Sequence, residues 1–146
     1  MKDHTQSAKA KVNNLSAEAL ELQEQFECAV NLANRHQANF NASGDDNERK
    51  NAISWNAKAW KLAKRIIAIK EDLRWEASAL AKAQKFLLES AGNDIEQTHI
   101  FQSNADYYDG MSTRAKAESD EYLEKRKEAF ENIKMLRTKT RCTAGA

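Results

Sequence analysis

The segment from Glu96 to His99 has residue types and a spacing that bind metals in helical proteins. A glutamate and a histidine three positions apart share one face of a helix, as in the di-iron carboxylate bundles. Such a site also needs a second pair of this kind and two more inward-facing glutamates. The chain has three histidines, and neither His4 nor His36 follows a glutamate at this spacing. We therefore predict that the protein binds no metal and no other cofactor.

The residues that usually act as nucleophiles are not arranged for catalysis. Neither Cys28 nor Cys142 has a histidine close to it in the sequence, and the chain has no Gly-x-Ser-x-Gly elbow. Its four glycines are isolated, so they form no phosphate-binding loop. We predict a protein that is not an enzyme and has no catalytic residues. We expect Cys28 to be a buried free thiol and Cys142 to lie in a tail, in a reducing compartment.

Basic residues gather in one stretch of the chain, with Lys58, Lys61, Lys64 and Arg65 placed over two turns without an intervening acid. Residues 46–92 contain ten Lys or Arg and six Asp or Glu, whereas the whole chain has a net charge of +1. Clusters of this kind bind phosphate backbones independently of sequence. Alternatively, their long side chains cover apolar surface or pair with acidic residues of neighbouring helices. Nucleic-acid binding by these four residues is therefore the alternative function that the sequence suggests.

The positions of the glycines, and the absence of proline, indicate long helices. Gly44 and Gly92 are each followed by an aspartate suited to cap a helix, Asp45 and Asp94, with a Glu or Gln three residues further on. Gly110 is a weaker stop, because a single glycine inside a helix costs only about 1 kcal/mol relative to alanine.

Between these stops, apolar residues recur at alternating intervals of three and four, which is the pattern of a helical heptad seam. We predict an all-α fold of three long antiparallel helices, or four if the chain breaks at Gly110, in an elongated, coiled-coil-like bundle. The bundle occupies residues 11–140 as one domain, and residues 1–10 and 141–146 form flexible tails. An additional apolar stripe through Trp60 predicts that the second helix contacts two neighbours near its N-terminal half.

Three polar residues interrupt the predicted seams: His36, Glu76 and Arg126. Single polar residues in a seam fix the register or the oligomeric state of helical bundles. Counting back from the turn at Gly92 places Glu76 near Tyr108 and Arg126 near Trp55 to Trp60. We therefore expect a Glu76–Tyr108 hydrogen bond and a cation–π contact between Arg126 and one of these tryptophans.

The predicted helix lengths leave part of the bundle uncovered. A first helix of about 30 residues spans roughly 45 Å and ends near the level of Trp75. The two-helix tip beyond that level carries large apolar side chains, and such surfaces usually mark an interface. The candidate interface residues are Phe86, Leu87, Ile100, Phe101, Tyr107 and Tyr108. The alternative is a short helix over about residues 95–108 that bends at Gly110 and covers the tip itself.

These patterns favour a binding or assembly protein, such as an adaptor, an inhibitor or a structural accessory. The expected partner is another protein or a second copy of this chain, with nucleic acid as the alternative and no membrane. The N-terminus has no apolar run typical of a secretory signal, and no segment approaches the roughly 18 consecutive apolar residues of a membrane span. We therefore expect a cytoplasmic protein.

Overall fold

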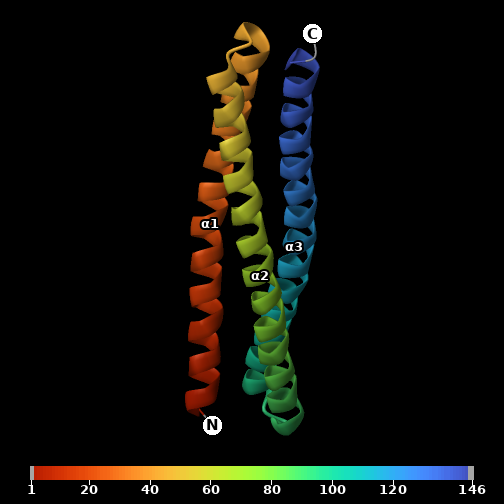
Figure 1. Ribbon diagram of the computed structural model, residues 1–146. Helices are drawn as coiled ribbons and strands as arrows, with labels where there is room; N and C mark the ends of the chain where they lie inside the picture. Colours follow the sequence, from red (N-terminus) through yellow and green to blue (C-terminus); the bar gives the residue numbers. More distant parts are fainter. Residues whose placement is uncertain (1, 145–146) are drawn as a thin grey trace. The chain divides into compact units, whose positions relative to one another are not determined.

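The computed structural model describes the backbone of residues 2–144 and the side chains of residues 6–139. This part of the chain forms three long helices, α1 (Lys2–Ser43), α2 (Asp46–Ser90) and α3 (Ile95–Ala144). Helix α1 packs on α2, and α2 packs on α3, so the fold is a three-helix bundle (Figure 1). The predicted all-α fold is confirmed.

The two turns lie where the glycines predict them. Gly44 and Gly92 have φ angles of +72° and +64°, which favour a residue without Cβ. Asp45 accepts a hydrogen bond from the backbone N–H of Asn47 at 2.9 Å, and Asp94 accepts one from Gln97 at 3.1 Å. Both aspartates therefore cap the helices that follow them, as predicted.

Helix α3 continues through Gly110 without a break, so the prediction of a fourth helix is wrong. Two contacts hold the chain on either side of this glycine. The Asp109 carboxylate pairs with Lys85 at 2.8 Å, and the Ser112 hydroxyl donates to the backbone carbonyl of Arg74 at 2.9 Å. These contacts with α2 hold the residues on both sides of Gly110 in the helix. They offset the small helix-destabilising effect of a single glycine.

Helix α1 begins at Lys2, earlier than the start of the predicted bundle at residue 11. Ala8 packs against a buried cluster formed by Val12, Leu73, Leu80 and Ala115. Helix α1 therefore packs along α2 beyond the level of Trp75. We expected the N-terminal end of the first helix at that level. The flexibility of the two predicted tails stays a prediction.

The chain divides into two compact units, each of which contains a segment of every helix. Unit 1 comprises residues 2–19 and 68–120 and has the cluster around Val12 and Leu80 as its core, with Tyr108 and Met111 packed against it. Unit 2 comprises residues 20–67 and 121–144.

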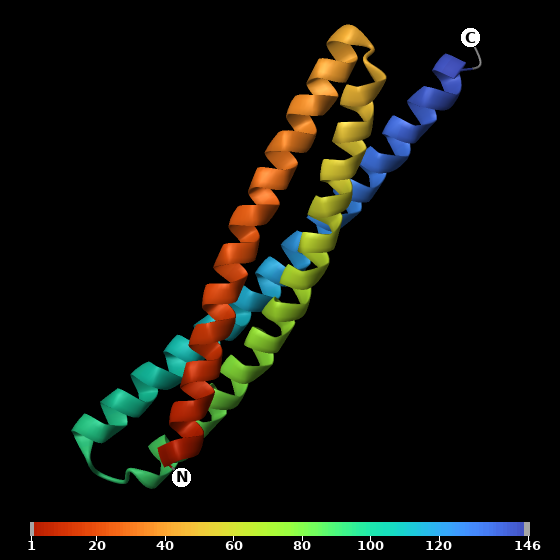
Figure 2. The same cartoon turned by 60° about the vertical axis from the view of Figure 1, so that its left-hand side comes forward.

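The core of unit 2 combines alanines with larger apolar side chains in about equal number. Ile66 and Leu136 are fully buried, and the rings of Phe26 and Tyr122 meet edge to face at 5.2 Å. Figure 2 shows α1 and α3 of this unit on either side of α2, so α2 has two neighbours there. The apolar stripe through Trp60 predicts this arrangement.

The predicted heptad seams are largely correct. The seam of α2 is buried from Ala59 to Leu80, with Glu76 half-buried, but Ala83 and Leu87 are exposed. Cys28 is also exposed, which contradicts the expectation of a buried thiol. It lies between the seam positions Phe26 and Ala29 and points outward, because a helix turns about 100° per residue. The side chain of Cys142 lies outside the described residues.

Candidate interaction surfaces

The end of unit 1 around the α2–α3 turn exposes large apolar side chains. The exposed fraction of the residue is 85% for Ile95, 68% for Phe86 and 57% for Tyr107, and Ile100 and Leu87 are also exposed. We call these five residues the hairpin-end surface. Ile95 was not among the predicted interface residues, because it stands alone beside the turn, outside the seam.

Two of the predicted interface residues, Phe101 and Tyr108, are half-buried. Tyr108 packs against the core of unit 1, and its ring meets that of Tyr107 edge to face at 5.2 Å. Burial raises the pKa of the Tyr108 phenol. These two aromatic residues support the hairpin end, whereas the exposed ones are free to contact a partner.

The predicted two-helix tip is shorter than expected, because α1 covers the region near Leu80. Further toward the turn, the contact between α2 and α3 becomes polar, with the Asn104 amide donating to the Gln84 side-chain carbonyl at 3.3 Å. Gln84 is itself buried. Apolar side chains near the turn therefore lie mostly outside, and a polar pair lies between the helices.

The four basic residues of α2 (Lys58, Lys61, Lys64 and Arg65) are all exposed. We call them the basic face. Within the described side chains, none of the four has a carboxylate within 4.0 Å, although ten other ion pairs form. Lys58 lies over the ring of Trp55, 5.1 Å from its centroid. The predicted alternative, in which acids of α1 and α3 neutralise these residues, is therefore not observed in this part of the chain.

Arg126 occupies the position that its seam spacing predicts. Its guanidinium lies 4.4 Å from the centroid of the Trp60 ring, which confirms the expected cation–π contact. The Nε atom of Arg126 is buried, and it has no hydrogen-bond partner among the described residues. The stacking on Trp60 is therefore the main interaction that the structure gives this side chain.

Of the other two seam residues, Glu76 forms an ion pair and His36 forms a hydrogen bond. Glu76 pairs with Lys11 of α1 at 2.8 Å, and no hydrogen bond between Glu76 and Tyr108 is found among the described residues, so the expected contact is wrong. Tyr108 instead packs against the core of unit 1. His36 Nδ1 lies 2.5 Å from Glu48 Oε2. This hydrogen bond from His36 is the main reason that the Glu48 pKa is lowered. The register role of all three seam residues stays a prediction.

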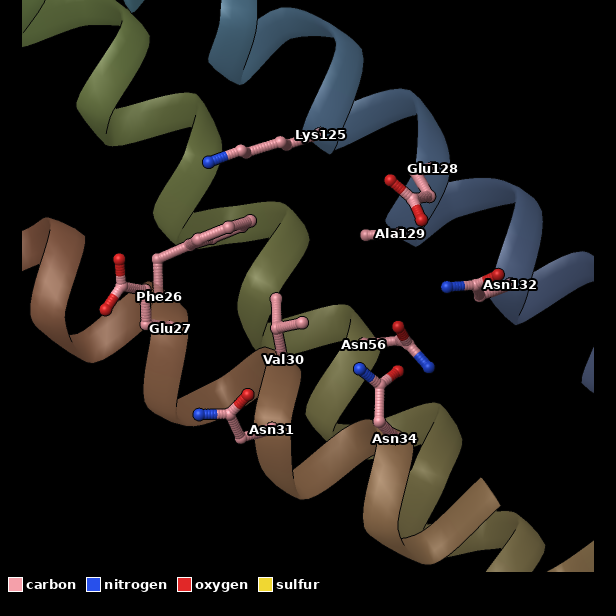
Figure 3. Close-up of a pocket in the computed structure, with 10 residues that line it drawn as sticks. All are labelled: Phe26, Glu27, Val30, Asn31, Asn34, Asn56, Lys125, Glu128, Ala129 and Asn132. Carbon is pink, nitrogen blue, oxygen red and sulfur yellow. The ribbon is translucent and has the colours of Figure 1, made fainter. Parts of the chain in front are cut away.

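A pocket of about 310 Å³ opens in unit 2 and is lined by residues of all three helices (Figure 3). Four asparagines contribute to it: Asn31 and Asn34 from α1, Asn56 from α2 and Asn132 from α3. Figure 3 shows Asn34, Asn56 and Asn132 among the residues that line the pocket, one from each helix. The pocket has apolar walls formed by Phe26, Val30 and Ala129.

None of these asparagines was a candidate site residue in the sequence. A signal was nevertheless present, because Asn56 interrupts a run of alanines, Ala52, Ala59 and Ala63, at helical spacing. All three alanines are fully buried, and Asn56 is 4% exposed.

Within the described side chains, no group of three or more His, Cys, Asp or Glu residues is placed to hold a metal ion. His99 is exposed. Over the same part of the chain, no helix combines the length and the apolar character needed to cross a membrane. Comparison of the chain with protein-family models, with curated proteins and with solved structures gave no match.

Proposed function

We propose that the protein acts by associating with another protein, or with a second copy of itself, through the hairpin-end surface. The observation that carries this proposal is the exposure of Phe86, Leu87, Ile95, Ile100 and Tyr107 around one turn. Single exposed apolar residues are common on protein surfaces, but a concentration of large ones marks an interaction site.

The energy available on association supports this function. Burial of apolar surface stabilises a complex by roughly 25 cal/mol per Å². Ile100 and Tyr107 lie seven residues apart and therefore on the same flank of α3, where a partner helix can cover both. Aromatic residues such as Tyr107 and Phe86 are also enriched at protein interfaces, where a few buried side chains supply most of the binding energy.

The test is a double substitution, Ile100→Asp with Tyr107→Asp, compared with the single substitution Leu20→Asp. Leu20 is also a strongly exposed apolar residue, but it belongs to α1 in unit 2. Sedimentation velocity measures self-association, and affinity purification from the source cell measures partner capture. We expect the double variant to lose association and keep its helical circular dichroism, and Leu20→Asp to keep both.

Two results contradict this proposal. One is a wild-type protein that stays monomeric at high concentration and captures no partner. The other is an association that survives in the double variant. The absence of catalysis and the cytoplasmic location stay predictions from the sequence.

A second candidate function, nucleic-acid binding, is supported by the unneutralised basic face. Positive side chains that have no acidic partner in the described structure are available to phosphates. Four phosphate contacts would make the logarithm of the binding constant fall with the logarithm of salt concentration at a slope of about −3.6.

For this candidate, Lys61→Glu with Lys64→Glu should abolish binding to a generic DNA duplex in fluorescence anisotropy. Lys127→Glu is the matched control, because Lys127 is an exposed lysine of α3 that pairs with Glu124 at 3.2 Å. A wild-type protein that shows no anisotropy change at low salt would exclude this function.

A further inference from the structure

The pocket of unit 2 has a buried polar group at its base. Asn56 is 4% exposed, and its amide donates to the backbone carbonyl of Ala52 at 2.9 Å, within the same helix. No hydrogen bond to its side-chain oxygen, Oδ1, is found among the described residues, and Oδ1 is not one of the buried atoms left without a partner. This oxygen is therefore accessible, and it can accept a hydrogen bond from a group that enters the pocket.

The pocket presents further carboxamides that are free to bind. Asn34 and Asn132 make no hydrogen bond with a described residue, and both line the pocket together with Asn56 (Figure 3). Each carboxamide offers a donor and an acceptor next to each other. The group that complements them best is another amide edge, which offers an acceptor and a donor at the same spacing.

The charges around the pocket disfavour an anion. Its lining includes the carboxylates of Glu27 and Glu128, and neither forms an ion pair with a described residue. The one lysine of the lining, Lys125, already pairs with Glu121 at 3.1 Å and lies over the Tyr122 ring at 4.6 Å. A positive charge on the ligand would therefore be attracted, and a negative charge repelled.

The size and walls of the pocket limit what fits. Its volume of about 310 Å³ lies at the small end of ligand sites, which range from about 300 to 1,000 Å³. Phe26, Val30 and Ala129 offer an apolar surface to the body of the ligand. We propose that this pocket binds a small cation that carries an amide edge on a flat apolar body.

The proposal is independent of the hairpin-end surface, since the pocket belongs to unit 2 and that surface to unit 1. Three probes with one amide and one ring test it: 4-(aminomethyl)benzamide, benzamide and 4-carbamoylbenzoate, which carry charges of about +1, 0 and −1 at pH 7. Benzylamine is the fourth probe, because it keeps the positive charge and the ring but lacks the amide.

Binding is measured by titration of the ¹⁵N-labelled protein, with the side-chain NH₂ signals of the asparagines followed by NMR. We expect 4-(aminomethyl)benzamide to bind most tightly. Benzamide should bind up to about fivefold more weakly, because it lacks the positive charge and so loses one exposed ionic contact. The anionic probe should bind most weakly. Benzylamine should bind about tenfold more weakly than 4-(aminomethyl)benzamide, because the amide hydrogen bonds are lost.

The matched variants are Asn34→Ala and Asn14→Ala, both at exposed positions of α1. Asn34→Ala should weaken binding of 4-(aminomethyl)benzamide up to about tenfold, and Asn14→Ala should leave it unchanged. Because Asn34 is exposed, its replacement by alanine does not threaten the fold. The proposal is overturned if no probe gives a saturable shift, if the anionic probe binds as tightly as the cationic one, or if Asn34→Ala binds like the wild type.

Discussion

The contact between His36 and Glu48 makes the stability of the fold depend on pH through the Glu48 carboxylate. The hydrogen bond from His36 lowers the pKa of Glu48 below its ordinary value of 4.5. A carboxylate with a lowered pKa in the folded state stabilises the fold fully above pH 4.5, and this stabilisation is lost as the pH falls through the folded-state pKa. Glu48 therefore contributes to stability at neutral pH and not in strong acid.

We predict that Glu48→Gln is less stable than the wild type at pH 6 and that this difference shrinks as the pH falls from 4.5 toward 3. Urea unfolding followed by circular dichroism at several pH values measures this difference. Glu89→Gln, an exposed glutamate of α2 with no ion pair among the described residues, should show a much smaller change. A difference that stays constant from pH 6 to pH 3 would contradict the role of the Glu48 carboxylate.

Arg126 gives a second prediction at the scale of single residues. Its planar guanidinium stacks on Trp60, and an ammonium cannot reproduce this geometry. Arg126→Lys should therefore lower the free energy of unfolding by about 0.5 to 2 kcal/mol. Arg137→Lys, at an exposed position of the same helix, is the control in the same urea experiment. Equal stability of both variants would mean that the stacking contributes nothing.

Contacts between residues of neighbouring helices are predicted by counting from the turns. The prediction of a contact is therefore no better than the prediction of where the helices end. Counting back from the capped turn at Gly92 places Arg126 at the level of Trp55 to Trp60, and the structure brings it to Trp60. The Glu76–Tyr108 contact fails because such a count gives the level of a residue along the bundle and not the helix that its side chain faces: Glu76 faces Lys11 of α1. The sequence does not predict that Asn56 is buried. Burial of a small polar residue depends on the distance between neighbouring helices, and residue spacing does not give this distance.

At the scale of elements, helix ends are predictable where residue chemistry requires a stop. Gly44 and Gly92 adopt positive φ angles, and the aspartates that follow supply the caps. Residues before 11 contain neither glycine nor proline, so nothing local ends α1 there. We began the predicted helix at its first seam residue, and the structure continues it to Lys2.

Gly92 and Gly110 make a matched pair for an element-scale prediction. Gly92→Ala should destabilise the protein by about 1 to 2 kcal/mol, because alanine is strained in the left-handed region. Gly110→Ala should stabilise it by up to about 1 kcal/mol, because Gly110 lies inside α3, has no positive φ and has open space where the Cβ would be placed. Thermal or urea unfolding gives both values. Destabilisation by Gly110→Ala would mean that α3 is not continuous there.

At the scale of the whole molecule, the charge is nearly balanced, with a net charge of +1 and an isoelectric point near 7.8. Long-range repulsion between copies is therefore weak near neutral pH and grows as the carboxylates become protonated. If the proposed association is between two copies through the hairpin-end surface, it should be strongest near pH 7.8 and weaken toward pH 5.

Sedimentation velocity at pH 5 and pH 7.8, each at low and high salt, measures this effect. Added salt screens the repulsion and should restore association at pH 5. Association that is strongest at pH 5 and low salt would show that charged contacts, and not the apolar side chains, hold the copies together.

The distribution of the three tryptophans gives each unit its own optical reporter. Trp55 and Trp60 belong to unit 2, whereas Trp75 belongs to unit 1, where it is 59% exposed and has the Arg74 guanidinium 4.5 Å from its ring centroid. Replacing Trp75 with Phe leaves only emission from unit 2, and replacing Trp55 and Trp60 leaves only emission from unit 1. Because α2 runs through both units as one helix, coincident melting curves from the two reporters would identify a single cooperative transition.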